Sequence, residues 1–209
     1  MKSIGIISGA GPLAGIVLHQ KIIYFYNKKG IYKDKDFPLI KHISFPFFST
    51  DISGVFDFYL SKKELSNAIS MCSNVDKIYL ACNSLLLSVP PEFQELVFDP
   101  RKTITQKIKN KEVVILASQS SIENEIYKNI STSVKYPSHE IQNKINTLIE
   151  KVMRGLKNNS ETKKQFNELI AQVSHKYPQD VILLGCTELC VFEPIENCIN
   201  VLDIIAEHI

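Results

Sequence analysis

Two segments of the chain place a cysteine in the same setting, almost half a chain length apart. Residues 77–84 read Lys-Ile-Tyr-Leu-Ala-Cys-Asn-Ser, and residues 180–188 read Asp-Val-Ile-Leu-Leu-Gly-Cys-Thr-Glu. Each has a short apolar run, a small residue, a cysteine and two polar residues. This pattern predicts a buried strand that ends just before the cysteine. Since open α/β sheets bind ligands at the carboxyl ends of their strands, Cys82 and Cys186 are candidates for flanking one small-molecule site.

A structural role is the alternative for any single cysteine. Cysteine is among the residues most often buried, and a lone cysteine after a strand is usually a small hydrophobe. The repeated pattern, with hydroxyl- or amide-bearing residues following both cysteines, favours the functional interpretation for Cys82 and Cys186. The remaining cysteines lack this setting and are predicted to be structural: Cys72, Cys190 and Cys198.

Composition is that of an ordinary globular chain. The 209 residues carry a formal net charge of +2, so bulk electrostatics does not indicate a nucleic-acid or anionic-membrane partner. Five irregularly spaced cysteines favour a reducing, cytoplasmic compartment over a disulfide framework, and no spacing of ligands indicates a metal site. Residues 4–18 are apolar enough for a signal peptide, but Gly9–Pro12 interrupt them. No apolar run reaches the ~20 residues that would span a bilayer.

Strands and helices are predicted to alternate, which indicates an α/β fold with mainly parallel strands. The expected strands are 3–7, 37–43, 77–81, 96–98, 112–117, 134–136, 180–185 and 198–202. The expected helices are 12–28, 61–72, 100–109, 122–129, 138–157, 161–176 and 203–209. Ser61 and Glu64 have the spacing of a capping box at a helix start. Residues 44–54 are expected to form an irregular loop over the site.

The turn after the first strand is rich in glycine. Gly9, Gly11 and Gly15 resemble a dinucleotide fingerprint, but the third glycine is one position late and the next strand lacks a terminal acidic residue. Nucleotide binding is therefore disfavoured. A tight turn, or a cradle of backbone N–H groups for a substrate carboxylate at Ser8 and Gly9, fits better.

Taken together, the motifs resemble the cofactor-independent aspartate/glutamate racemases over nearly the whole chain. Residues 4–14 are similar to that family's opening strand and glycine turn. Ala81-Cys-Asn-Ser84 resembles its Pro-Cys-Asn-Thr motif, and Gly185-Cys-Thr-Glu188 matches its second cysteine motif without change. Residues 116–121 resemble its hydroxyl-rich turn.

The resemblance implies two pseudo-symmetric, Rossmann-like half-domains with the site in the cleft between them. Residues 1–97, with a C-terminal helix at 203–209, would form the half that carries Cys82, and residues 98–202 the half that carries Cys186. One thiolate would remove the α-proton of an amino acid, and the other thiol would protonate the opposite face. No cofactor and no metal are implied. The residues that would hold the substrate are Ser8, Gly9, Asn83, Ser84, Ser118, Ser120, Ser121, Thr187 and Glu188.

One departure bears on the substrate. Aspartate-type members carry an arginine for the side-chain carboxylate in the region that reads here Phe47-Phe-Ser-Thr-Asp51. Without that clamp, we expect weak turnover of aspartate and better turnover of a neutral or larger amino acid. The alternative is that Lys157 or Lys163 supplies the cation.

Several interpretations stay open at the level of sequence. Glu188 either bonds near Cys186 or opens the next helix, Asp51 is favoured as a surface charge, and Arg101 and Arg154 are expected on the surface. A decarboxylase or cis–trans isomerase, and a non-catalytic binding protein with the same fold, are the alternatives to a racemase. The expected binding partner is a small-molecule amino-acid substrate, and a homodimer is the assembly that we consider.

Overall fold

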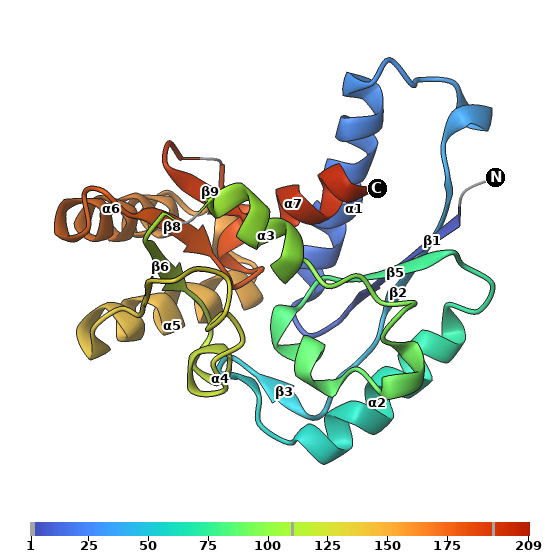
Figure 1. Ribbon diagram of the computed structural model, residues 1–209, viewed down its shortest axis with the longest axis horizontal. Helices are drawn as coiled ribbons and strands as arrows, with labels where there is room; N and C mark the ends of the chain where they lie inside the picture. Colours follow the sequence, from blue (N-terminus) through green and yellow to red (C-terminus); the bar gives the residue numbers. More distant parts are fainter. Residues whose placement is uncertain (1–2, 110, 194) are drawn as a thin grey trace.

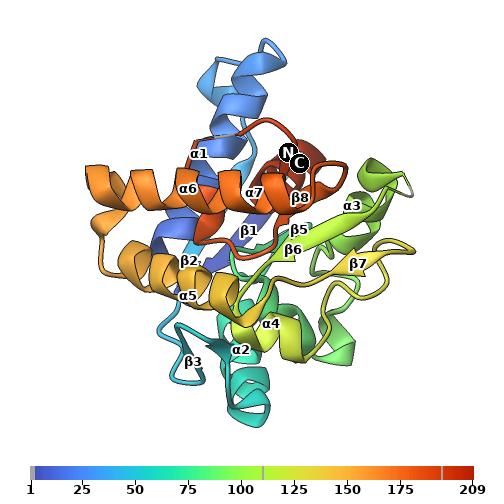
Figure 2. The same cartoon turned by 90° about the vertical axis from the view of Figure 1, so that its left-hand side faces the viewer.

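The computed structural model describes residues 3–109, 111–193 and 195–209. Most of its strands belong to two sheets, each built of parallel strands (Figures 1 and 2). The first sheet has the order β2-β1-β5, with β1 at Ser3–Ser8, β2 at Leu39–Ser44 and β5 at Lys77–Leu80. The second has the order β7-β6-β8-β9, with β6 at Val113–Leu116, β7 at Val134–Lys135, β8 at Val181–Leu184 and β9 at Cys198–Asn200. The predicted α/β class with mainly parallel strands is confirmed.

Seven α-helices accompany these sheets within the described residues: α1 at Pro12–Lys28, α2 at Phe58–Met71, α3 at Arg101–Ile108, α4 at Gln119–Glu123, α5 at His139–Met153, α6 at Ser160–Lys176 and α7 at Val201–His208. Short 3₁₀ turns lie at Asp34–Asp36, Asn83–Ser88, Pro91–Phe93, Leu156–Asn158 and Leu189–Val191. The C-terminal helix α7 packs against α1, as Figure 1 shows. None of the described helices is long and apolar enough to cross a bilayer.

The region expected to be an irregular loop contains a small antiparallel hairpin. Its strands are β3, Thr50–Asp51, and β4, Gly54–Val55. The hairpin lies between α2 and α4, near where the ends of the two sheets approach each other (Figure 1). It is therefore a fixed element at the site.

The capping box at Ser61 is wrong. Helix α2 begins earlier, at Phe58, and the Asp57 carboxylate caps it by accepting a hydrogen bond from the Leu60 N–H at 2.9 Å. The Glu64 carboxylate instead accepts hydrogen bonds from Phe48 N at 2.9 Å and from Ser49 Oγ at 2.6 Å. Glu64 is therefore used by the loop before the hairpin and not by its own helix start, because the N–H groups of that loop need acceptors when they are buried.

Other differences are smaller. The strand expected at 96–98 is a single bridge between Val97 and Ile78, and the helix expected at 122–129 is the shorter and earlier α4. Arg101 is not a free surface side chain: its guanidinium makes a two-point ion pair with Asp99. Arg154 does form the expected surface pair, with Glu150 at 2.7 Å.

Candidate active site

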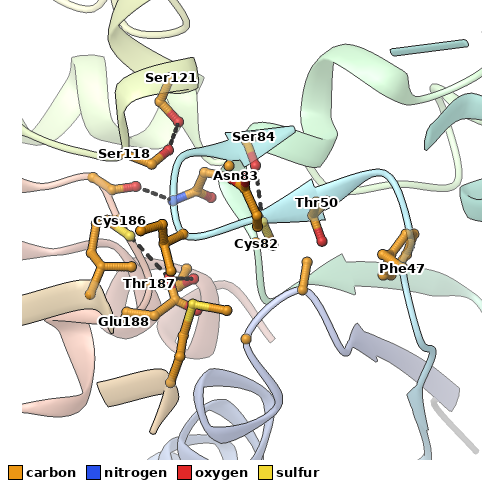
Figure 3. A pocket seen from close by; sticks show the side chains of 18 of the residues that line it. Phe47, Thr50, Cys82, Asn83, Ser84, Ser118, Ser121, Cys186, Thr187 and Glu188 are labelled. Carbon is orange, nitrogen blue, oxygen red and sulfur yellow. Dashed lines mark hydrogen bonds between the residues drawn. The ribbon is translucent and has the colours of Figure 1, made fainter. Parts of the chain in front are cut away.

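The two predicted cysteines lie at the carboxyl ends of β5 and β8 and line one cavity of about 190 Å³ (Figure 3). Cys82 comes from the first sheet and Cys186 from the second, and their side chains are nearly buried, at 8% and 7% exposure. An engineered cavity of ~150 Å³ is large enough for benzene, so this cavity suits a small amino acid. The full lining is Gly9, Ala10, Gly11, Phe47, Thr50, Asp51, Ile52, Gly54, Cys82, Asn83, Ser84, Ser118, Ser121, Ile149, Met153, Gly185, Cys186, Thr187 and Glu188.

Cys82 has a hydroxyl as its side-chain partner. A hydrogen bond of 3.1 Å joins its sulfur to Ser84 Oγ (Figure 3). Burial, followed by the charge of Glu188, raises the pKa of the Cys82 thiol to about 11, although the bond to Ser84 acts in the opposite direction. The resting form of Cys82 is therefore the thiol, which can donate a proton.

Cys186 has a carboxylate as its partner. Its thiol donates a hydrogen bond to Glu188 Oε2 at 3.0 Å (Figure 3). Both interpretations left open for Glu188 therefore hold, because Glu188 also directly precedes the short 3₁₀ turn at Leu189–Val191. Burial, followed by the charge of Glu188, raises the pKa of Cys186 well above its usual value. Burial also raises the pKa of Glu188, which makes this carboxylate a better proton acceptor for the thiol. Charge on Cys82 raises the pKa of Cys186, which disfavours ionising both thiols together.

The glycine turn after β1 makes room for this pair. A Cβ atom on Gly11 would lie 1.6 Å from Glu188 Oε1, and the φ of 87° at Gly11 is in the left-handed region that favours glycine. Helix α1 then starts at Pro12, whose missing N–H costs nothing at a first helical position. The turn thus leaves room for the Glu188 side chain to pack closely against it.

Two hydrogen bonds tie the cysteine motifs to each other. Asn83 Nδ2 donates to the Gly185 carbonyl at 2.8 Å, and the Thr187 hydroxyl donates to the Ala81 carbonyl at 2.9 Å. In each case the residue after one cysteine bonds the residue before the other cysteine. All four groups are buried, so these bonds fix how the two strand ends face each other.

The serine turn at 118–121 has two functions. Ser118 and Ser121 line the cavity and bond each other, Oγ to Oγ at 2.9 Å (Figure 3). Ser120 does not line the cavity. Its hydroxyl donates to the Val55 carbonyl at 2.6 Å, and its N–H donates to the Ser53 carbonyl at 2.7 Å. Ser120 therefore holds the β3–β4 hairpin against α4.

Some candidates lie away from the cavity. Ser8 is fully buried and its hydroxyl is bonded to His42 Nε2 at 2.9 Å, a pairing that the sequence analysis missed. Lys157 and Lys163 line a different cavity, beside Phe166 and Phe192. The three cysteines expected to be structural lie outside the lining: Cys72, Cys190 and Cys198.

Apolar contributors were also missed. Ile149 and Met153, at the end of α5, line the cavity. Phe47 also lines it, and Phe47 belongs to the loop that the sequence analysis had already connected with the substrate side chain. Along the sequence, the two α5 residues look like ordinary members of an amphipathic helix face, and no local signal separates them from the core. Within the described part of the chain, no group of three or more His, Cys, Asp and Glu side chains could hold a metal ion.

Solved structures share the fold that carries this site. The aspartate racemase of Picrophilus torridus superposes with a TM-score of 0.74 at 19% identity, covering 99% of this chain and 91% of its own. An aspartate racemase homologue from Pyrococcus horikoshii gives 0.71 at 19% identity, covering 100% and 97%. This chain has the aspartate/glutamate racemase fold.

The same fold extends to a glutamate racemase from Thermus thermophilus, solved with β-chloro-D-alanine. Its TM-score is 0.66 at 14% identity, and the match covers 99% of this chain and 78% of that one. By sequence, the chain matches no protein-family model and no curated protein. The racemase fold is thus shared at a level where sequence alone carries little signal outside the two cysteine motifs.

Proposed function

We propose that the chain is a cofactor-independent amino-acid racemase or epimerase that inverts an α-carbon with Cys82 and Cys186. The observation that carries the proposal is that two thiols, one from each parallel sheet, line a single cavity of amino-acid size. Inversion by proton transfer needs a base on one face of the carbanion and an acid on the other. The fold shared with aspartate and glutamate racemases supports the same reaction class.

The proton inventory favours Cys186 as the first base. Its thiol proton moves along the existing 3.0 Å hydrogen bond to Glu188, which leaves a Cys186 thiolate and a neutral carboxylic acid. The thiolate takes the α-proton of the substrate, and the Cys82 thiol gives its proton to the opposite face. The products are the inverted amino acid, a Cys186 thiol, a protonated Glu188 and a Cys82 thiolate. The Cys82 thiolate serves as base for the reverse reaction, stabilised by the Ser84 hydroxyl at 3.1 Å.

The polar lining would hold the substrate. Ser84, Ser118 and Ser121 present hydroxyl groups to the cavity, and Gly9 lies at the turn whose backbone is proposed to cradle a carboxylate. Asn83 and Thr187 are partly committed to the bonds that join the two motifs, so their main proposed role is to position the cysteines.

The proposed working form is a cytoplasmic homodimer built of half-domains at 1–97 with 203–209 and at 98–202. Five free thiols support a reducing compartment. Exposed aromatic side chains near the hairpin, Phe48, Phe56 and Tyr59, support self-association. Sedimentation velocity of the purified protein measures the assembly directly.

The function is tested by proton exchange. Each enantiomer of a panel of amino acids is incubated with the protein in D₂O, without added cofactor, and NMR follows the loss of the α-proton signal. We expect exchange together with inversion for at least one amino acid. A catalytically silent protein across the whole panel would refute a racemase and leave the binding-protein alternative.

A further inference from the structure

The charges that line the cavity are all of one sign. Among the lining residues that the structure describes, Asp51 and Glu188 are the charged side chains, and none is Lys, Arg or His. The two lysines that were the alternative source of a cation, Lys157 and Lys163, line the separate cavity beside Phe166. A ligand with a second carboxylate would enter this cavity without a cationic partner for it.

One negative charge stays within the cavity throughout the proposed reaction. Before proton transfer it lies on the Glu188 carboxylate, which accepts the thiol hydrogen bond at 3.0 Å. After transfer it lies on the Cys186 sulfur. The pair therefore carries one negative charge in either form until the α-proton is removed. That step makes the pair neutral and moves the charge onto the substrate, and protonation by the Cys82 thiol then leaves the charge on the Cys82 sulfur. The cavity thus holds one negative charge at every stage of the proposed reaction.

Asp51 brings a second carboxylate to the cavity from the tip of the β3–β4 hairpin. Its Oδ1 accepts hydrogen bonds from the Ser53 N–H at 2.7 Å and the Ser53 hydroxyl at 2.5 Å, which fix the side chain. The tip is itself anchored, because the Ser53 carbonyl accepts a hydrogen bond from the Ser120 N–H at 2.7 Å. Asp51 is thus an exposed residue that lines the cavity. Its carboxylate is held by the two hydrogen bonds from Ser53, and Ser53 is held by Ser120.

From this charge pattern we infer that the substrate is an α-amino acid whose side chain is neutral or cationic, and that Asp51 determines this preference. The inference rests on the proposed racemase function. A side-chain ammonium group would pair with Asp51, a neutral amide would be tolerated, and a side-chain carboxylate would be repelled and left without a partner. The preferred class is a short diamino acid, and aspartate is the disfavoured one.

A nearly isosteric series tests the inference: aspartate, asparagine and 2,4-diaminobutyrate. We expect kcat/KM for α-proton exchange to be lower for aspartate than for asparagine by at least about tenfold, and to be highest for the diamino acid. The Asp51→Asn variant keeps an Oδ1 acceptor for Ser53 but removes the charge. It should lower the ratio of kcat/KM for diaminobutyrate to kcat/KM for asparagine by about threefold to fivefold. It should also raise kcat/KM for aspartate relative to that for asparagine.

Asp34→Asn is the matched control, because it removes the same charge from an exposed turn outside the cavity. It should leave all three values unchanged. Calorimetric binding of the three amino acids separates the two proposals. Absence of exchange with a retained binding order would refute the racemase but support the charge preference. Equal or stronger binding and turnover of aspartate, or an unchanged order in Asp51→Asn, would overturn the inference.

Discussion

Cys82 and Cys186 each bond the side chain two residues further along the chain, Ser84 at 3.1 Å in one case and Glu188 at 3.0 Å in the other. Their backbones are alike: each follows a parallel strand of its own sheet. Their partners differ in acid–base chemistry. A hydroxyl can stabilise a thiolate but does not take up its proton near neutral pH, whereas a carboxylate can. The two strand ends therefore supply two thiols, and in the proposed mechanism the carboxylate partner makes Cys186 the first to be activated.

The bonds between the motifs show a second difference. The Gly185 carbonyl accepts hydrogen bonds from both Asn83 and Tyr127, each at 2.8 Å. For the Ala81 carbonyl, the side-chain donor that the described residues supply is the Thr187 hydroxyl. The carbonyl before Cys186 thus accepts two side-chain hydrogen bonds, whereas the carbonyl before Cys82 accepts its side-chain hydrogen bond from Thr187.

The largest effect is expected from removing either thiol. Cys82→Ala and Cys186→Ala should each lower racemisation by roughly 10²–10⁴-fold or more, because each thiol serves one face of the substrate. Polarimetry on a substrate found by the exchange panel measures the loss. Cys198→Ala is the control, since Cys198 lies in β9 outside the cavity, and it should retain activity. A Cys82 or Cys186 variant with full racemase activity would contradict the two-thiol account.

The partners should differ in their effect on the pH profile. In the wild type, the Cys186–Glu188 pair acquires its negative charge as pH rises through the pKa of Glu188, which burial raises above 4.5. In Glu188→Gln the charge must come from the Cys186 thiol, whose pKa is still raised above its usual value by burial, the largest cause of its shift. The rising limb of kcat/KM should therefore move above pH 9, with a loss at pH 7 of about 100-fold.

Ser84→Ala is the counterpart at the other cysteine. It removes a hydrogen bond that lowers the pKa of Cys82 but no proton acceptor, so we expect a loss below about tenfold and a rising limb that stays in place. Kinetics of both variants across pH 6–10 make the comparison. Identical profiles for Glu188→Gln and the wild type would remove Glu188 from the mechanism.

The smallest effects concern stability. Thr187→Val should leave the buried Ala81 carbonyl without its side-chain donor and lower the free energy of unfolding by ~1–3 kcal/mol. Asn83→Ala should cost less through its hydrogen bond, about 1 kcal/mol, because Tyr127 still bonds the Gly185 carbonyl. Urea unfolding gives both values, and Thr187→Ser, which keeps the hydroxyl, is the control. A larger cost for Asn83→Ala than for Thr187→Val would reverse the proposed difference.

The sequence predicted what local patterns determine. Strand periodicity placed Cys82 and Cys186 at strand ends, and the polar residues after them proved to line the same cavity. Contacts between segments that are distant in the chain could not be predicted from the sequence. Glu64 had the spacing of a capping residue, yet its carboxylate accepts hydrogen bonds from the backbone N–H groups of residues 48 and 49. Ser8 had the position of a site residue, yet it is buried away from the cavity and its hydroxyl is hydrogen-bonded to His42.

Apolar lining residues were hidden for a different reason. Met153 occupies the same type of helical position as any core residue, and only the approach of α5 to the strand ends brings it to the cavity. Asp51 was assigned to the surface because an isolated acidic residue in a loop carries no positional signal. Its exposure is real, but the hairpin directs it to the cavity mouth.

Enantiomer-resolved α-proton exchange in Cys82→Ala and Cys186→Ala tests the central claim most directly. Each variant keeps one thiol and therefore access to one face of the α-carbon. We predict that the two variants exchange the α-proton of opposite enantiomers in D₂O, without inversion, while the wild type exchanges and inverts both. Exchange of the same enantiomer by both variants, or of both enantiomers by either one, would contradict a pair of thiols on opposite faces of the substrate.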